Sequence, residues 1–400
     1  MANRNYQPTP ENKRRYKFTF GLWTFRHRGA DPFGEPTKTA LPVQEGLRGL
    51  AARHVYGFNF HDDDLVPFGS TARQRDAILR ETQQTMRDHN IVAAMGTTNL
   101  FYKDVFKDGA FTSSDPKIRA YAVQKTMRGI DLAVSLGAKI YVFWGGREGA
   151  EVDAAKNPME ALKWYREAIN FLSNYVKEQA KHDSAYQGVV FALEAKPNEP
   201  RGDIYLATTG HMLGFIATLD NREMIGVNPE FGHELMAGLN FYHTLCQAKD
   251  AGKLFHVDLN TQRPLRFDED RRFGAQVLQD AFWVVRALES GYAGPRHYDC
   301  HPSRAEDLEG AWSFVEGCME QYLILAEKNE ILNQDPEMQG YLKARESLRH
   351  PEIEQMLGKP SLENFQKLRE MNFDLESLAR TPLKLEAMDR RFNRILTGTQ

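Results

Sequence analysis

The sequence predicts an α/β protein: a (β/α)8 barrel of the TIM type with a C-terminal helical arm. Eight short apolar runs, rich in β-branched and aromatic residues, recur before residue 300. Stretches with helical spacing alternate with these runs, which favours a parallel sheet with right-handed crossovers. Eight repeats of this alternation favour closure into a barrel over an open doubly wound sheet. After residue 330 the strand-like runs stop and only helix-compatible segments follow.

Each expected strand is a short apolar run between polar or turn residues. The strands are expected at residues 17–23, 55–60, 91–95, 139–144, 188–193, 224–227, 254–259 and 295–298. The helical spacing predicts helices that include residues 73–88, 117–136, 161–179, 273–289 and 305–326. Further helices are expected at 337–349, 362–371 and 383–396, with prolines at 351, 360 and 382 as punctuation.

These elements predict two parts, a catalytic barrel at residues 1–330 and a helical arm at residues 331–400. A tail of this length can hardly hold a core of its own. We expect the arm to serve subunit contacts by packing on a neighbouring copy. An arm folded back on its own barrel is the alternative.

Composition excludes several classes of protein. Hydrophobic residues make up 42% of the chain and the net charge is −3, without a basic block, which argues against nucleic acid and anionic membranes as partners. The longest apolar runs, such as 140–144, fall far short of the roughly 20 residues of a membrane span. The polar N-terminal residues lack the apolar stretch of a secretory signal, so we expect a cytoplasmic protein. Cys246, Cys300 and Cys318 fit reduced thiols better than disulfides.

Four expected strands lead into carboxylates, namely Glu194, Glu230, Asp258 and Asp299. Taken singly, an acid at a strand end often caps the next helix. In a barrel, however, the carboxyl ends of all strands meet at one mouth, where catalytic groups lie. Four carboxylates held close together cannot all stay ionised without a cation, so a metal is required or some of them are protonated.

A second acidic cluster is expected beside the first. Glu230 and His233 are three residues apart, on one helical turn or tight loop, and Asp268 and Asp270 would face the same way in an extended chain. This predicts a second cation with Glu230 as the bridge. With Lys196, two divalent ions bring the formal charge of the six carboxylates to about −1. Such oxygen-rich sites suit Mg²⁺, Mn²⁺ or Co²⁺ better than structural zinc.

The remaining mouth residues are a histidine pair and an aromatic wall. Asp64 follows His61 by three residues, a spacing that lets the carboxylate reach Nδ1 and leave Nε2 free toward the mouth. Trp23, Phe101 and Trp144 would exclude water and stack on a sugar. A structural histidine and core packing are the respective alternatives.

Two conspicuous sequences are expected to bind no ligand. Asp62 and Asp63 are interpreted as residues at the start of a helix or on the surface. Gly145 and Gly146 lack the spacing and the Lys-Ser/Thr ending of a phosphate loop, and so predict a tight turn.

Taken together, long motifs in a fixed order resemble xylose isomerase, in its shorter actinobacterial-type class. The likeness runs from about Phe18 to Gln339. The motifs are FTFGLWT at 18–24, FHDDDLVPFG at 60–69, WGGREGAE at 144–151, KPNEPRGD at 196–203, NPE at 228–230 with GHE at 232–234, LFHVDLN at 254–260 and GPRHYD at 294–299.

The resemblance implies an aldose–ketose isomerase. Its expected reaction is D-xylose to D-xylulose, and weakly glucose to fructose, by a metal-assisted 1,2-hydride shift after ring opening. By motif position, His61 with Asp64 looks like the ring-opening pair, and Lys196 resembles the residue that hydrogen-bonds the carbonyl oxygen. The implied ligands are Glu194, Glu230, Asp258 and Asp299 for a structural metal, and Glu230, His233, Asp268 and Asp270 for a catalytic metal.

The same resemblance implies two divalent cations per subunit, with Mg²⁺ the first expectation and Mn²⁺ or Co²⁺ as alternatives. It also implies a homotetramer, a dimer of dimers, in which the C-terminal arm embraces a neighbour. Phe33 matches an aromatic that enters the partner subunit's pocket, and Glu199-Pro200 matches a cis peptide bond.

The chain also departs from the family pattern. Asp299-Cys300-His301-Pro302 replaces Asp-Tyr-Lys-Pro, Ala195 replaces a proline, Phe231 replaces a threonine, and the loop after the first strand reads Phe25-Arg26-His27. Because His27, Phe231 and His301 are expected to alter the rim of the pocket, two alternatives stay open. One is a paralogue that acts on a different aldose, and the other is a homologue that binds metal or sugar with little isomerase activity.

Overall fold

The computed structural model describes residues 6–399. The chain divides into two compact units, and the boundary between them falls between Ile324 and Leu325. The first unit is built around one parallel sheet, whose described strands are arranged in the order β8-β6-β4-β3-β2-β1-β9. These strands are β1 (Phe18–Gly21), β2 (Gly57–His61), β3 (Val92–Thr97), β4 (Ile140–Trp144), β6 (Val190–Glu194), β8 (Ile225–Val227) and β9 (Arg296–Tyr298).

One expected strand, 254–259, is not a regular strand but a chain of isolated parallel bridges. Leu254 pairs with Val227 of β8, and Asp258 pairs with His297 of β9. The segment therefore joins the two outer strands of the sheet and fills the eighth position of the ring. A separate two-stranded pair, β5 (Gly149–Ala150) and β7 (Asp203–Ile204), is antiparallel.

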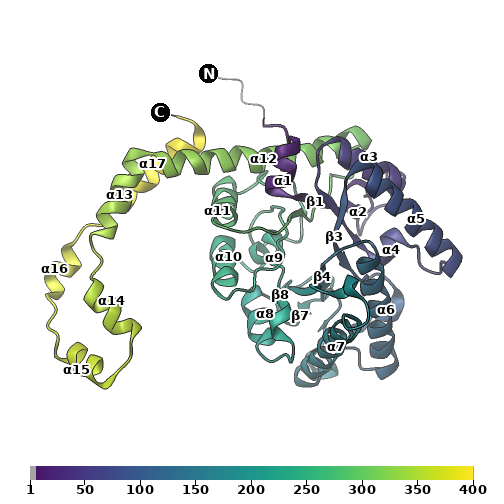
Figure 1. The fold of residues 1–400 in the computed structure, drawn as a ribbon, viewed down its shortest axis with the longest axis horizontal. Coiled ribbons are helices and arrows are strands. Elements are labelled where there is room, and N and C mark those ends of the chain that lie inside the picture. The colour runs from purple at the N-terminus through teal and green to yellow at the C-terminus, as the bar shows by residue number, and fades with distance from the viewer. Residues whose placement is uncertain (1–5, 400) are drawn as a thin grey trace. The chain divides into compact units, whose positions relative to one another are not determined.

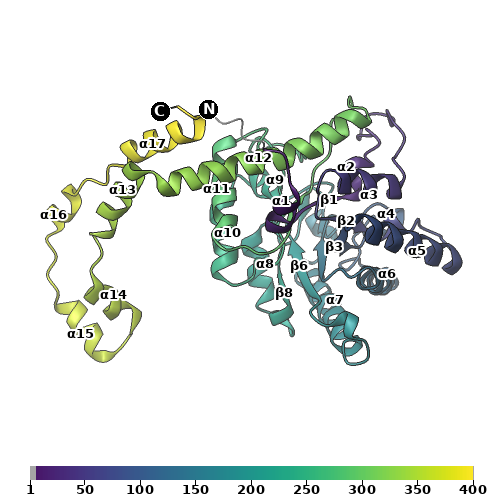
Figure 2. The ribbon, with the colours of Figure 1, turned by 45° about the horizontal axis from the view of Figure 1, so that its top comes forward.

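Helices follow the strands and surround the sheet (Figures 1 and 2). In the first unit they are α1 (Pro10–Tyr16), α2 (Leu22–Phe25), α3 (Val43–Ala52), α4 (Asp62–Leu65), α5 (Ala72–His89), α6 (Pro116–Ser135), α7 (Pro158–Gln179), α8 (Thr209–Ile216), α9 (Phe231–Met236), α10 (Phe241–Asp250) and α11 (Leu278–Glu289). Short 3-10 helices are η1 (Asp104–Phe106), η2 (Asp153–Ala155), η3 (Ser184–Tyr186) and η4 (Arg222–Met224).

The helix expected at 273–289 begins later than the sequence pattern predicts. It begins at Leu278 because Val277, with φ +42°, has a left-handed backbone that cannot continue a right-handed helix. The helix expected at 305–326 is longer, since α12 (Leu308–Gln334) crosses the boundary between the two units.

The sheet is buried on both faces, as parallel strands covered by helices must be. All four residues of β1 are buried, and Phe58 and Phe60 of β2 are almost fully buried. Met95, Val142 and Ala192 form a cluster of buried side chains, against which Trp23 packs. This apolar core fixes the strands, and the polar residues at their carboxyl ends then share one rim.

The second unit contains α13 (Pro336–Glu346), α14 (Pro351–Gly358), α15 (Leu362–Glu370), α16 (Leu375–Arg380) and α17 (Leu385–Thr397). Arg391 of α17 donates to Asp335 at the start of α13, with 3.0 Å from Nε to Oδ2. The sequence pattern did not predict α14 and α16, and Pro351 opens α14 at a position where proline is well tolerated. Within residues 6–399 the structure has no helix long and apolar enough to cross a bilayer.

Candidate metal centre

Four carboxylates from four positions of the sheet meet at its carboxyl end. Glu194 is the last residue of β6, Glu230 directly precedes α9, Asp258 lies in the bridging segment and Asp299 directly follows β9. One oxygen from each lies within 4.8 Å of the others. The four strand-end acids therefore form one group, as their joint placement in a barrel requires.

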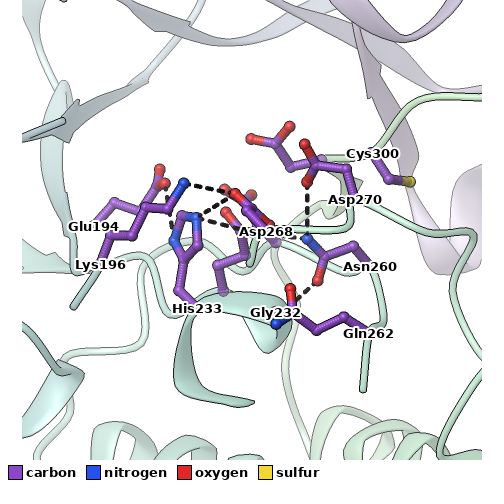
Figure 3. Close-up of polar contacts among 12 residues, drawn as sticks. Glu194, Lys196, Gly232, His233, Asn260, Gln262, Asp268, Asp270 and Cys300 are labelled. Atoms are coloured by element: carbon purple, nitrogen blue, oxygen red, sulfur yellow. Dashed lines mark hydrogen bonds and ion pairs between the residues drawn. The ribbon is translucent and has the colours of Figure 1, made fainter. Parts of the chain in front are cut away.

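A second group shares Glu230 with the first. Glu230, Asp268 and Asp270 lie within the same 4.8 Å limit, and so do Glu194, Glu230 and His233. His233 Nε2 lies 3.2 Å from Glu230 Oε1 and 3.3 Å from Asp268 Oδ2. Figure 3 shows Glu194 at the end of β6, His233 on α9, and Asp268 and Asp270 from one irregular segment converging on the same point. Glu230 is common to all three groups.

The expectation that Asp268 and Asp270 face the same way because the chain is extended is wrong. The chain there is not extended, because Asp270 has φ +44°, in the left-handed region. Asp270 therefore has a left-handed backbone in place of the extended one that was expected. The His301 N–H donates to the main-chain oxygen of Asp270 over 3.2 Å and so anchors this segment.

The electrostatics of the cluster favour a cation. Burial and neighbouring carboxylates raise the pKa of Glu194, Glu230 and Asp270 well above the ordinary values, and burial together with Asp258 raises the pKa of Asp299 to about 7. Each of these groups resists ionisation because it is buried and lies beside negative charge that is not compensated. A divalent ion would compensate it.

Asp268 differs from these acids because Lys196 lies beside it. Although burial opposes ionisation, the Lys196 ammonium and His233 hold the pKa of Asp268 well below its usual range. The buried Oδ1 of Asp268 has no hydrogen-bond partner in the described chain. Burial lowers the pKa of His233, so its imidazole is neutral and can act as a ligand. These donors fit a divalent cation in chemistry and in number.

Lys196 reaches the second group from the loop after β6. Its Nζ donates to Asp268 Oδ2 over 2.7 Å and lies 3.5 Å from Glu199 Oε2. The ammonium also lies over the Trp144 ring, 5.3 Å from its centroid. Although burial opposes the charge, Asp268 raises the pKa of Lys196, so this lysine is a permanently protonated donor at the mouth.

His61 ends β2 with its ring against the mouth. Nδ1 lies 2.8 Å from Asp64 Oδ2, and this carboxylate also accepts the main-chain N–H of His61. The ring centroid of Trp23 lies 4.6 Å from that of His61, and the centroid of Phe101 lies 5.5 Å from it. Phe101 in turn meets Trp144 edge to face at 4.6 Å. The three aromatic residues and His61 thus form one continuous wall.

Trp23 connects this wall to the acidic cluster, because its Nε1 donates to Asp299 Oδ1 over 2.6 Å. Phe33 is the one site residue that the structure leaves apart. It lies in the loop between α2 and α3, and its side chain is 98% exposed. The chain does not bring Phe33 into its own mouth.

The departures from the family pattern have separate environments. The rings of His27 and His301 stack, with centroids 3.8 Å apart, and His301 Nε2 lies 3.6 Å from Asp270 Oδ2. Phe231, in contrast, is fully buried and stacks on Phe241, so the expectation that it alters the pocket rim is wrong. Its size and its position at the start of α9 direct the ring into the core.

Three further expectations from the sequence concern residues that are not among the expected metal ligands. Gly145 accepts the N–H of Glu148 in a turn, and the Glu199–Pro200 peptide bond is cis. Asp62 begins the short helix α4, as one of the two interpretations given for it predicted. Its side chain is 15% exposed and forms an ion pair with the buried Lys125.

Two asparagines in the site escaped the sequence analysis. Asn228 Nδ2 donates to Glu194 Oε2 over 3.0 Å and to Asp258 Oδ2 over 2.6 Å. Asn260 donates to Glu230 Oε1 over 2.7 Å and accepts the N–H of Gly232. Both amides fix the orientation of carboxylates in the cluster. Each lies two residues from a strand-end acid, which is the signal that could have identified it.

The chain is similar to known sugar isomerases. A model of the family described as xylose isomerase-like TIM barrel matches residues 50–312. A xylose isomerase of Thermus thermophilus is 51% identical over 340 residues, which cover 85% of each chain. A xylose isomerase of Thermus caldophilus is 46% identical over 397 residues, covering 99% of this chain and all of the relative.

Solved structures share the fold at low identity. An L-ribulose 3-epimerase superposes with a TM-score of 0.58 at 16% identity, covering 80% of this chain and 97% of the other. A xylose isomerase domain protein from Alicyclobacillus acidocaldarius gives a TM-score of 0.56 at 14% identity, covering 78% and 99% of the two chains. At such identities the likeness extends to the barrel fold alone.

Proposed function

The chain belongs to the xylose isomerase family, and from this premise we propose that it converts D-xylose to D-xylulose, and D-glucose to D-fructose weakly. The observation that carries the proposal is the pair of acidic groups that share Glu230 at the mouth. Such a pair fits two divalent cations.

Glu194, Glu230, Asp258 and Asp299 would hold one cation, and Glu230, His233, Asp268 and Asp270 would hold the other. When bound, the cations supply Lewis-acid stabilisation of negative charge on the sugar oxygens. The absence of cysteine ligands and the excess of carboxylate oxygen favour Mg²⁺ as the resident ion, with Mn²⁺ and Co²⁺ as substitutes.

The protein side chains carry the rest of the reaction. His61, oriented by Asp64, moves the proton that opens the sugar ring, and Lys196 donates to the carbonyl oxygen of the open aldose. The C2–H bond then breaks and a C1–H bond forms as hydride moves, while the proton of O2 is transferred to O1. The sugar is thus isomerised without an external oxidant or reductant. The wall of Trp23, Phe101 and Trp144 keeps water from the migrating hydride.

The test is a sugar assay with defined metals. The metal-stripped protein, given D-xylose, should form D-xylulose only after Mg²⁺, Mn²⁺ or Co²⁺ is added. Absence of ketose over a range of pH with all three ions would overturn the proposal. A second candidate, isomerisation of a different aldose, rests on the His27–His301 stack beside Asp270, and a panel of aldopentoses and aldohexoses separates the two.

We further propose a homotetramer, with residues 1–330 as the catalytic barrel and residues 331–400 as an arm that contacts a neighbour. The exposed apolar side chains of α15 and α16 support this role. The almost fully exposed Phe33 is proposed to enter the partner's pocket. Free thiols at Cys246, Cys300 and Cys318 support a cytoplasmic location, where they stay reduced.

A further inference from the structure

A buried lysine outside the mouth connects α4, which directly follows β2, to the loop that follows β3. Lys125 lies on α6, and its side chain is only 8% exposed. Its Nζ donates to Asp62 Oδ2 over 2.5 Å and to the main-chain oxygen of Asn99 over 3.0 Å. Asp62 Oδ1 accepts the N–H of Asn99 over 3.0 Å, which completes a closed set of three bonds. We call Lys125, Asp62 and Asn99 the Lys125 clamp.

The clamp connects to the mouth at both ends. Asp62 directly follows His61 in the chain. The side-chain oxygen of Asn99 accepts the N–H groups of Phe101, over 3.3 Å, and Tyr102, over 3.0 Å. The Phe101 ring meets His61 nearly edge to face, at an interplanar angle of 71°.

The burial of the Lys125 ammonium has an energetic cost that its partners must offset. An ammonium removed from water costs several kcal/mol unless it is paired and hydrogen-bonded, and the free energy is recovered only in good geometry. Lys125 satisfies this condition through Asp62 and Asn99, with Asp63 Oδ2 also within 3.8 Å. Breaking the set would leave an unpaired buried charge, and the two loops would separate to hydrate it.

We propose that Lys125 and Asp62 are positioning residues, which set the contact of Phe101 with His61 and hence the shape of the sugar pocket. The inference rests on the proposed function in assigning these two rings to that pocket. The clamp touches neither the sugar nor a metal ligand in this arrangement. It acts through the main chain of residues 61–62 and 99–101.

The first measurement needs neither sugar nor metal. In protein with ¹³C-labelled histidine rings, the Phe101 ring current shifts the Cε1–H resonance of His61, which is identified by its loss in H61F. Lys125→Met should move this resonance and raise the KM for xylose about tenfold, with a smaller change in kcat, since misplacements near 1 Å can cost up to about 10²-fold. Asp62→Ala should do the same. Asp62→Asn keeps an acceptor for the Asn99 N–H and should give a smaller change in both.

Lys156→Met is the matched control. Lys156 is 4% exposed and forms an ion pair with Asp108 over 3.1 Å, and none of its described bonds involves Asp62 or Asn99. This variant should leave the His61 resonance in place. The proposal is overturned if Lys125→Met and Asp62→Ala leave the resonance and KM unchanged, or if Lys156→Met changes them equally. If Lys125→Met does not fold, Asp62→Asn decides by the same criterion. A wild-type protein without isomerase activity whose His61 resonance still moves in Lys125→Met would refute the proposed function alone.

Discussion

His61 Nδ1 lies 2.8 Å from Asp64 Oδ2, and the same oxygen accepts the main-chain N–H of His61 over 3.2 Å. One carboxylate therefore fixes both the ring and the backbone of the histidine. Because a carboxylate only accepts, Nδ1 carries the proton and Nε2 is left for the mouth.

This pair predicts a pH effect. Although burial opposes the charged imidazole, Asp64 raises the pKa of His61. If neutral His61 is the base that opens the ring, Asp64→Asn should lower its pKa and move the acid limb of kcat/KM for xylose to lower pH. His61→Phe should reduce kcat/KM by about 10²- to 10⁴-fold. A pH profile of both variants checks this, and an unchanged acid limb in Asp64→Asn would contradict it.

Lys196→Met should lower kcat much more than it changes KM. In the proposed reaction the ammonium donates where negative charge develops on the carbonyl oxygen, and removal of one such donor costs about 10²- to 10³-fold in kcat. Steady-state kinetics with Mg²⁺ measure the loss. Lys163→Met, at a side chain that is 67% exposed on α7, is the control and should behave as wild type. A loss confined to KM would show that Lys196 binds sugar without stabilising the transition state.

Much of the site could be predicted because a barrel places the carboxyl ends of all its strands at one mouth. An acid at the end of any strand must lie at the same mouth, so Glu194, Asp258 and Asp299 could be grouped from strand ends alone. The loop residues could not be placed in this way. Asp270 has a left-handed backbone, and its main-chain oxygen accepts a hydrogen bond from His301, which lies 31 positions away in the chain.

The other misses have a similar cause. Segment 254–259 reads as a strand, yet its pairing is interrupted, and Phe231 looks like a rim residue until α9 directs it into the core. The Lys125 clamp could not be predicted from the sequence because α6 and α4 meet only in the tertiary fold. Periodicity reports which face is apolar, but not which polar groups will meet.

The acidic cluster predicts that Mg²⁺ stabilises the protein more at pH 8 than at pH 5. Four carboxylates have raised pKa values, and that of Asp299 is about 7. Such acids favour folding while protonated. In the metal-free protein, their contribution falls as pH rises from about 4, where the unfolded chain ionises, through the raised folded values. Mg²⁺ removes this repulsion, and its binding strengthens as the ligands lose protons.

Thermal unfolding with EDTA or with Mg²⁺, measured from pH 5 to pH 8, tests this prediction. The difference in Tm between the two conditions should widen with pH. Glu230→Gln should reduce the widening, because it removes the carboxylate common to all the groups. A difference that stays constant or narrows over this range would argue against a metal-dependent cluster.

Substitution of Glu230 and substitution of Asp258 should give proteins that bind different numbers of metal ions. Glu230 belongs to every group of potential ligands, whereas Asp258 belongs to one. Glu230→Gln should therefore weaken both cations, and Asp258→Asn should weaken one. Calorimetric titration of the stripped protein with Mn²⁺ should show two sites per subunit in the wild type and one strong site in Asp258→Asn. Equal loss in both variants would argue against two separate sites.

Substitutions of exposed leucines in the arm should change the assembly of the protein without changing its fold. Leu375 and Leu378 on α16 are 73% and 61% exposed in the single chain. Burying a leucine in an interface contributes about 1.5–3 kcal/mol, and each 1.4 kcal/mol is about tenfold in affinity. The double variant Leu375→Glu with Leu378→Glu should thus shift the sedimentation coefficient from that of the proposed tetramer to that of a smaller species, while the far-ultraviolet circular dichroism stays unchanged. Met159→Glu, at a 78% exposed position on α7, is the control and should sediment as wild type. If the double variant also sediments as wild type, α16 does not contribute to the interface, because two buried glutamates could not be accommodated there without weakening it.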